Sequence, residues 1–216
     1  MRVLPCGSCA LLVELEDLDQ VLGYYAALRA DPPAGVVDIV PAGRTVMVTV
    51  DNADLSTLER TLLNTTPLQD RRTGGDLVEI PVVYDGEDLA DVAKLLSCSV
   101  EEVVRRHTSE EWTVAFCGFA PGFGYLTGES SWDIPRRSSP RTKVPAGSVA
   151  LAGEFSGVYP RESPGGWQLI GRTEVAVFDL DRDPTALLSP GRRVRFVNAT
   201  PAPPSVADPG SPGRRG

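Results

Sequence analysis

A cluster of basic residues lies between positions 136 and 172 of a chain that is acidic as a whole, with a formal net charge of −8. It holds six basic and two acidic residues: Arg136, Arg137, Arg141, Lys143, Arg161 and Arg172 against Glu154 and Glu162. Arginine binds carboxylate or phosphate through its two-pronged guanidinium, and lysine adds a compact charge. Prolines at 135, 140 and 145 stiffen the segment. The pattern predicts an anion-binding site, with a solvent-exposed charged loop as the alternative.

Two glycine-rich stretches lie next to this cluster. From Phe116 to Leu126, glycine and proline are interleaved with aromatic residues. Glycine lets the backbone approach a ligand closely, and aromatic faces bury its apolar part, so the stretch indicates a pocket wall or an aromatic-lined barrel corner. Further on, the paired glycines of Ser163–Gly166 either present successive N–H groups to an anion or form a hairpin turn.

These patterns define the candidate site. The predicted catalytic residues are Arg141, Lys143, Glu162 and His107. The predicted substrate- and anion-binding residues are Phe123, Tyr125, Arg136, Ser148, Ser163, Gly165, Gly166 and Arg172. Glu162 is the carboxylate best suited to proton transfer, although it has arginine neighbours to pair with. His107 lies near a predicted helix end, where a purely structural role explains it equally well.

Several kinds of site are not indicated. The single histidine excludes multi-histidine metal sites, and we expect no metal-ligand set. Neither lysine follows a phosphate-loop pattern, and there is no G-x-S-x-G nucleophile motif. Cys6 and Cys9 form a C-x-x-C without the second pair of a zinc ribbon, and Cys117 lacks a neighbouring base that would favour a nucleophile.

The overall composition narrows the setting of the protein. The acidic balance argues against a broad nucleic-acid surface, which requires a basic face. No apolar run reaches the roughly 18 residues of a membrane-spanning helix, and the N-terminal residues do not have the pattern of a signal peptide. We therefore expect a cytoplasmic protein without a membrane or nucleic-acid partner.

Residues 1–76 are predicted to form a small α/β unit. Strands are expected at 10–15, 36–40 and 45–50, with helices from Leu18 and from near Asp54. Ser56 and Glu59 fit a capping box for the second helix. The order strand, helix, strand, strand, helix favours two helices on one face of a small antiparallel sheet.

Residues 77–198 are predicted to begin with an edge strand over 77–84, which contains Pro81, and two helices over 88–97 and 99–107. Short strands follow at 112–116, 148–152, 167–170, 174–180 and 192–197, with one short helix at 184–188. Many short strands separated by turns favour a barrel or a sandwich. Residues 199–216, rich in proline and glycine, are predicted to be a disordered tail.

Five ordered motifs resemble the bacterial family that contains PxpB, the B subunit of ATP-dependent 5-oxoprolinase. They are FAPGFGYL (119–126), PRRSSPR (135–141), KVPAGSV (143–149), GVYP (157–160) and SPGGWQLIGRT (163–173). The family also includes the sporulation-kinase inhibitor KipI and proteins named allophanate hydrolase subunit 1, and it resembles half of the carboxyltransferase domain of urea carboxylase. The resemblance implies an α+β chain with a small N-terminal α/β sandwich domain and a C-terminal cyclophilin-like β-barrel.

The resemblance also implies a reaction and partners. The reaction is the opening of 5-oxoproline to L-glutamate, driven by ATP with Mg²⁺, by a hetero-oligomer that contains a PxpC-like (KipA-like) and a PxpA-like subunit. Phosphorylation of the lactam oxygen would make a poor electrophile labile to water, and basic side chains would stabilise the transferring charge. Two alternatives remain: a subunit acting on allophanate or another urea-type amide, and a KipI-like kinase inhibitor that catalyses nothing.

Overall fold

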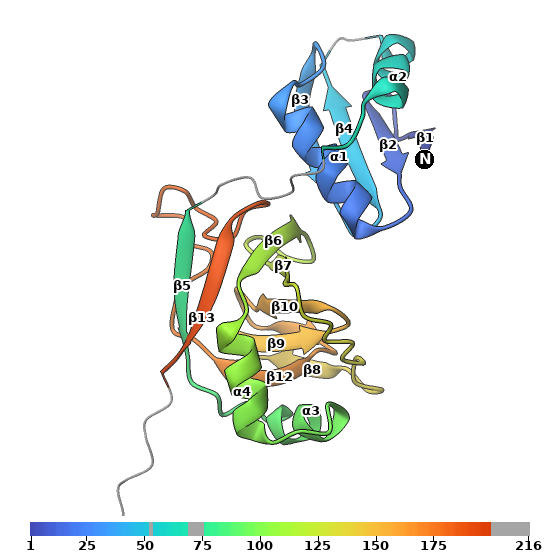
Figure 1. The fold of residues 1–216 in the computed structure, drawn as a ribbon. Coiled ribbons are helices and arrows are strands. Elements are labelled where there is room, and N and C mark those ends of the chain that lie inside the picture. The colour runs from blue at the N-terminus through green and yellow to red at the C-terminus, as the bar shows by residue number, and fades with distance from the viewer. Residues whose placement is uncertain (52–53, 69–75, 200–216) are drawn as a thin grey trace, which may run out of the picture.

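The computed structural model describes residues 1–51, 54–68 and 76–199. Its first part is a four-stranded antiparallel sheet of strand order β1-β2-β4-β3 with two helices (Figure 1). The elements are β1 (Arg2–Pro5), β2 (Ala10–Glu14), α1 (Leu18–Ala30), β3 (Val36–Pro41), β4 (Thr45–Val50) and α2 (Leu55–Asn64). The predicted order is confirmed from β2 onward. The additional strand β1 is short and mostly exposed, so it carries little of the apolar alternation by which strands are recognised.

Both helices of this part cover the same face of the sheet. Val13 on β2 and Val48 on β4 belong to one buried cluster with Val21 on α1 and Leu62 on α2. The hydroxyl of Tyr24 on α1 donates a 2.6 Å hydrogen bond to the main-chain oxygen of Leu62, which joins the helices. Burial raises the pKa of Tyr24 to about 12, so this donor keeps its proton at any physiological pH.

The start of α2 differs from the prediction in its capping residue. The N-cap is Asp54, whose carboxylate accepts a 3.0 Å hydrogen bond from the main-chain N–H of Ser56. Ser56 is therefore inside the helix, and the predicted Ser56–Glu59 capping box is wrong. Asp and Ser cap equally well, so the pattern alone does not choose between neighbours. The helix α4 (Val100–Ser109) is capped by a serine, since Ser99 accepts a 3.2 Å hydrogen bond from the N–H of Glu102.

The second part is a seven-stranded sheet of order β12-β9-β10-β7-β6-β13-β5 (Figure 1), and β8 and β11 pair in a separate two-stranded ribbon. The remaining elements are β5 (Leu77–Val82), α3 (Leu89–Leu95), α4 (Val100–Ser109), β6 (Trp112–Cys117), β7 (Gly124–Thr127), β8 (Arg141–Val144), β9 (Ser148–Ala152), β10 (Phe155–Val158), β11 (Ser163–Gly165), β12 (Gln168–Arg172) and β13 (Arg193–Asn198).

This sheet is nearly closed into a barrel. Its two outermost strands are joined through Val83 and Arg172, which exchange two main-chain hydrogen bonds of 2.9 Å. The strand β5 occupies an edge of the hydrogen-bonded order, as Pro81 predicted, since proline lacks the N–H of a central strand. The mixed fold with a barrel-like sheet is confirmed.

Two predicted elements of the second part are wrong. Residues 174–180 form no strand, and residues 184–188 form no helix. Their main-chain groups instead hold one loop together: the N–H of Leu187 donates to the oxygen of Val177, and that of Asp179 to the oxygen of Thr185, both at 2.9 Å. The Arg182 guanidinium adds a 2.7 Å hydrogen bond to the oxygen of Ala176. The apolar residues of 174–180 favour a strand, but the main-chain groups of this segment bond within the loop.

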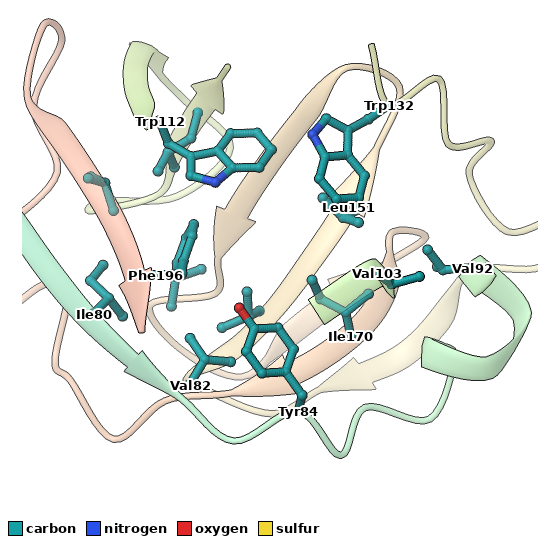
Figure 2. Packing of buried hydrophobic residues seen from close by; sticks show 14 of the residues in the cluster. Ile80, Val82, Tyr84, Val92, Val103, Trp112, Trp132, Leu151, Ile170 and Phe196 are labelled. Atoms are coloured by element: carbon teal, nitrogen blue, oxygen red, sulfur yellow. The ribbon is translucent and has the colours of Figure 1, made fainter. Parts of the chain in front are cut away.

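The barrel core is built from residues of the sheet and the two helices (Figure 2). Its largest fully buried members are Trp112 and Trp132, whose ring centroids lie 5.8 Å apart, and Phe196 on β13. Residues 69–75 lie outside the described residues, as do residues 200–216 of the tail predicted over 199–216. Within the described ranges, no helix is long and apolar enough to cross a membrane.

Candidate functional site

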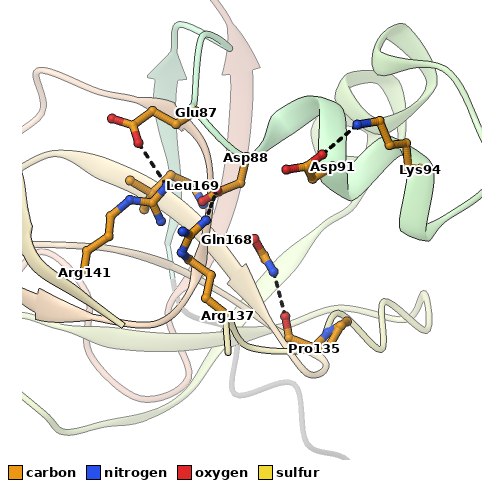
Figure 3. A network of polar contacts seen from close by, with 9 residues as sticks. All are labelled: Glu87, Asp88, Asp91, Lys94, Pro135, Arg137, Arg141, Gln168 and Leu169. Carbon is orange, nitrogen blue, oxygen red and sulfur yellow. Dashed lines mark hydrogen bonds and ion pairs between the residues drawn. The ribbon is translucent and has the colours of Figure 1, made fainter. Parts of the chain in front are cut away.

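Two arginines of the basic cluster converge on one buried carboxylate (Figure 3). Nη1 of Arg137 lies 2.6 Å and Nη2 of Arg141 lies 2.9 Å from the same oxygen, Oδ1 of Asp88. The side chain of Asp88 is only 2% exposed, whereas those of Arg137 and Arg141 are 34% and 15% exposed. Arg141 also reaches the exposed Glu87 at 3.0 Å. The two guanidinium groups are therefore held in fixed positions at the edge of the barrel.

Asp88 is placed by the turn that begins α3. It occupies the N-cap position but makes no side-chain cap; its Oδ2 instead accepts a 2.7 Å hydrogen bond from the N–H of Leu169 on β12. Burial alone would raise the pKa of Asp88, but the hydrogen bonds from Arg141 and Leu169 and the charges of both arginines outweigh it and lower that pKa. Asp88 is thus ionised and links the basic segment to the barrel wall.

Two donors of this arginine pair have no partner within the described part of the chain. They are Nη1 of Arg141 and Nε of Arg137, and both are buried. An unpaired buried N–H loses its hydration without compensation. An anion or a water molecule that reached these donors would recover that cost, and the fork geometry of guanidinium suits carboxylate and phosphate oxygens. The chemistry of the donor set therefore fits an anionic ligand.

The predicted residues Lys143 and Glu162 form an ion pair at the surface of the β8–β11 ribbon. Nζ of Lys143 lies 3.0 Å from Oε1 of Glu162, and the side chains are 74% and 59% exposed. Lys143 and Arg141 are two positions apart on β8, so they share one face of the strand. Ser163 and Gly165 pair with β8 at Val144 and Arg141. The ribbon thus brings together the predicted residues 141, 143, 162, 163 and 165.

An aromatic cluster adjoins the ribbon. Phe123 is 1% exposed and packs edge-to-face on Tyr125, Tyr159 and Trp167, at centroid distances of 5.1, 5.4 and 5.3 Å. Burial raises the pKa of Tyr159, whereas a hydrogen bond with the main chain of Trp167 and the positive charges of Arg136 and Arg141 act in the opposite direction. The predicted residues Phe123, Tyr125 and Arg136 therefore belong to the same region as the ribbon.

Phe119 is the exposed end of this cluster. It is 56% exposed, has a positive φ of 65°, and contacts Phe123 and Tyr159 edge-to-face. A positive φ is uncommon for a residue with a side chain and is held here by the surrounding loop. The segment 116–126 is thus partly barrel packing and partly an exposed aromatic surface, so both interpretations of it apply to different residues.

The remaining anion-binding candidates have structural partners. Gly166 accepts a 2.8 Å hydrogen bond from the N–H of Arg137 and so fixes the basic segment. Ser148 is buried on β9, where its main-chain oxygen accepts the N–H of Tyr159 at 2.9 Å. Arg172 lies at the strand junction that closes the barrel and pairs with Asp85 at 2.9 Å. In the described part of the chain, no hydrogen bond or ion pair joins Arg172 to Arg137, Arg141 or Asp88.

His107 lies in the barrel core, apart from the ribbon. It is fully buried, with Nδ1 at 2.8 Å from the Tyr84 hydroxyl and Nε2 at 2.8 Å from the Ser156 hydroxyl. Its ring stacks on Phe196 at a centroid distance of 4.4 Å. Burial lowers its pKa to about 3, so the imidazole is neutral. The geometry gives His107 a structural role and does not support the catalytic role considered for it.

Sequence reasoning missed the residues that organise this site. Asp88 precedes the arginines by about 50 positions, and its place before a helix is typical of an ordinary cap. Arg137 belongs to the basic cluster, but nothing in the sequence distinguishes it from its neighbours. Among residues 1–51, 54–68 and 76–199, no three His, Cys, Asp or Glu side chains are arranged to hold a metal ion.

Comparisons with known proteins identify the family of the chain. The family model described as "Carboxyltransferase domain, subdomain C and D" matches residues 1–188. The chain is 40% identical over 202 residues to the B subunit of 5-oxoprolinase from Escherichia coli O157:H7, covering 88% of this chain and 93% of that relative. It is 50% identical over 133 residues to the B subunit of 5-oxoprolinase from Bacillus subtilis (strain 168), a match that spans 55% of that relative.

Solved structures extend the comparison to the fold. The crystal structure of TTHA0988 is 38% identical with a TM-score of 0.72, and the match covers 90% of this chain but 41% of that one. Kluyveromyces lactis urea amidolyase, 19% identical with a TM-score of 0.65, shares the fold over 93% of this chain and 16% of its own length. By its motifs, its fold and these matches, the chain belongs to the family of carboxyltransferase domain, subdomains C and D.

Proposed function

We propose that the chain is the B component of an ATP-dependent 5-oxoprolinase, which opens 5-oxoproline to L-glutamate together with PxpC-like and PxpA-like subunits. The observation that carries this proposal is the near full-length similarity to the B subunit of 5-oxoprolinase from Escherichia coli O157:H7, at 40% identity over 93% of that relative. That relative is one component of an enzyme with several subunits. We also propose that this chain alone, without its partner subunits, does not turn over 5-oxoproline.

The arginine pair supports a role in binding anions. Substrate and product of the proposed reaction carry carboxylates, and ATP carries phosphates. Arg141 and Arg137 are held by Asp88 at 2.9 and 2.6 Å and retain buried donors without a partner in the described part of the chain. Preorganised donors stabilise developing negative charge without reorganising during the reaction. We assign them to an oxyanion or phosphoryl oxygen, with Arg136 as a further positive charge near Tyr159.

Lys143 and Glu162 supply a second, more accessible pair. Their 3.0 Å contact lies at the surface, where either partner can exchange it for a substrate group. In the proposal, Lys143 contacts the transferring charge and Glu162 accepts or returns a proton. Phe119, exposed beside Phe123 and Tyr159, offers an apolar face to the ring of a small substrate.

ATP with Mg²⁺ is part of the proposal. Bound ATP would supply the phosphoryl group that makes the lactam carbonyl labile to water. The side chains that suit its phosphates are Arg136, Arg137, Arg141 and Lys143, since guanidinium and ammonium groups bind phosphate oxygens. Mg²⁺ would enter with the nucleotide, because this cation is commonly held by substrate phosphates and water rather than by a dedicated protein cage.

The experiment that tests the function is reconstitution. The chain is co-expressed with the PxpC-like and PxpA-like proteins of its own genome, and glutamate is measured with 5-oxoproline, ATP and Mg²⁺. Each component is then left out in turn. Glutamate that requires every component supports the proposal. A stable three-subunit complex that forms no glutamate overturns it.

Two further substrates and one kinase-inhibition assay distinguish the alternatives. Allophanate and urea are supplied to the same complex, and ammonia release from either one would favour a urea-type amide. If the complex is inactive on all three substrates, inhibition of a histidine kinase's autophosphorylation by this chain alone would favour the regulatory alternative. In each case, the 5-oxoprolinase proposal is rejected when the same complex forms no glutamate from 5-oxoproline.

A further inference from the structure

Two exposed cysteines flank a tight turn in the first sheet, far along the chain from the arginine pair. Cys6 follows β1 and Cys9 precedes β2, and both side chains are exposed. The proposed function uses neither residue. The strands on either side are in register, with Pro5 opposite Leu11, so the positions of the two cysteines are set by the hairpin.

The turn keeps the two residues close together. Gly7 and Ser8 are its central residues, and Gly7 has a positive φ of 72°, which glycine adopts without strain. A positive φ at the first central position, without one at Ser8, is typical of the type II′ hairpin turn. The first and fourth Cα atoms of a β-turn lie within about 7 Å. Disulfides require a Cα separation of about 4.4–6.8 Å, so this spacing is compatible with one.

The main chain on both sides of the turn is fixed. The N–H of Cys6 donates to the oxygen of Ala10 at 2.9 Å, and the oxygen of Cys9 accepts the N–H of Val50 on β4 at 2.8 Å. These hydrogen bonds oppose opening of the hairpin, which would be needed to move the two cysteines apart. A second thiol held beside the first has a high effective concentration, which favours an intramolecular reaction over capture of another molecule.

The other two cysteines are in different surroundings. Cys98 and Cys117 are both half-buried and pack against the barrel core. The thiol of Cys117 contacts the main-chain oxygen of Leu188 at 3.5 Å, and burial raises its pKa to about 11. Because the thiolate is the reactive form, Cys117 is a poor nucleophile. These two residues serve as internal controls for the exposed pair.

We propose that Cys6 and Cys9 form a dithiol modification site that closes to a disulfide by exchange with low-molecular-weight disulfides such as glutathione disulfide. The thiolate of one cysteine attacks the small disulfide, forms a mixed disulfide and releases one small thiol. The thiolate of the other cysteine then displaces the second small thiol. The pair loses two electrons and two protons in all, and the small disulfide is reduced to two thiols.

The test uses the full chain in buffers of stepped glutathione to glutathione disulfide ratio, followed by acid quenching, alkylation and tryptic mass spectrometry. Cleavage after arginine and lysine places both cysteines in one peptide, residues 3–29, and the controls in peptides 95–105 and 107–136. The expected product is peptide 3–29 lighter by two hydrogen atoms and protected from alkylation. It should form at glutathione ratios that are still too reducing to oxidise the control peptides.

Cys6→Ser and Cys9→Ser supply the matched comparison. Each variant keeps one exposed thiol, so it should accumulate mixed disulfide with glutathione to at least about tenfold the wild-type level, because no second thiol removes it. Thermal melting of each reduced variant shows that the fold is kept. Wild-type peptide 3–29 carrying two glutathione groups, or oxidation of the control cysteines at the same buffer ratio, would overturn the proposal. So would a disulfide formed only between two chains.

Discussion

One buried carboxylate fixes the positions of both arginines in the candidate site. Asp88 has three partners: Arg137 and Arg141 on one oxygen and the N–H of Leu169 on the other. A buried ion pair is costly to break, because the charge that remains has lost its hydration and its partner. The carboxylate therefore has two roles, since it holds the donors and also joins the basic segment to β12.

Asp88→Asn tests this arrangement. It removes the charge that both arginines face, and we expect the free energy of unfolding to fall by about 3 kcal/mol, the lower end for a broken buried pair, because Arg137 is partly exposed. Urea denaturation followed by circular dichroism measures the change. Glu87→Gln is the matched control, because Glu87 contacts Arg141 from an exposed position and should leave the midpoint unchanged. Equal midpoints for Asp88→Asn and wild type would contradict the account.

Lys143→Ala separates catalysis from stability. Lys143 and Glu162 are both exposed, and exposed ion pairs contribute little to stability, so we expect an unchanged melting temperature and a large loss of turnover in the reconstituted complex. Thermal melting and glutamate release on the same preparation measure both. Unchanged turnover would remove Lys143 from the site. The sequence alone predicts the same unchanged stability for Arg141→Ala, but the contact of Arg141 with buried Asp88 now predicts a loss of stability.

The β8–β11 ribbon and its aromatic neighbours act as one packed element. A Cβ atom at Gly165 would lie 2.3 Å from the hydroxyl and 2.9 Å from Cζ of Tyr159, a ring that is only 2% exposed. A Cβ atom at Gly166 would have its nearest neighbour, Pro140, at 3.8 Å. Packing against Tyr159 therefore requires glycine at position 165, whereas position 166 has room for a side chain.

Gly165→Ala and Gly166→Ala exploit this difference. The first forces Tyr159 or the ribbon to move, so we expect a loss of about 1–3 kcal/mol in the free energy of unfolding, as in other overpacked sites. The second has room for a methyl group and should change the free energy by less than about 0.5 kcal/mol. Chemical denaturation of both variants measures the contrast. Equal losses would show that Tyr159 does not constrain the ribbon.

Elements with strong local patterns were predictable from the sequence. The strand over 45–50 alternates buried and partly buried residues and was predicted with its observed bounds. The strands β8 and β11 were missed, because SPG and RTKV show no alternation and are defined by pairing with each other. The basic cluster was found because charge is visible in the sequence. Asp88 was not, because its contact with Arg141 depends on how α3 packs on β12.

At the scale of the whole molecule, the barrel encloses a row of hydrogen-bonded polar side chains. Tyr84, His107 and Ser156 are linked by two 2.8 Å hydrogen bonds within an otherwise aromatic and aliphatic core. Trp112 adds a 3.1 Å hydrogen bond from its indole N–H to the main-chain oxygen of His107. Buried polar groups that are fully paired specify one arrangement of a core. The buried histidine also makes the barrel sensitive to acid. It is neutral in the folded state, and at acidic pH it binds a proton when the protein unfolds.

Acid should therefore destabilise the barrel through His107. Its pKa is lowered from 6.5 to about 3 in the folded chain, so the unfolded chain binds more protons between these values. Stability should be lost progressively as pH falls from about 6.5 to 3, by on the order of 5 kcal/mol in all. Urea midpoints across this range measure the slope. His107→Gln should be less stable at neutral pH and should lack this part of the slope; an identical slope in both proteins would refute the assignment.

We propose above that the arginine pair serves the reaction of a complex in which this chain is one subunit. Arg141→Lys tests it most directly, because lysine keeps the charge but lacks the two-pronged donor. Glutamate release is measured with the reconstituted complex, and size-exclusion chromatography of the same sample shows that the complex is intact. We expect turnover to fall by about 100-fold or more in an intact complex. Wild-type turnover in the intact Arg141→Lys complex would contradict it.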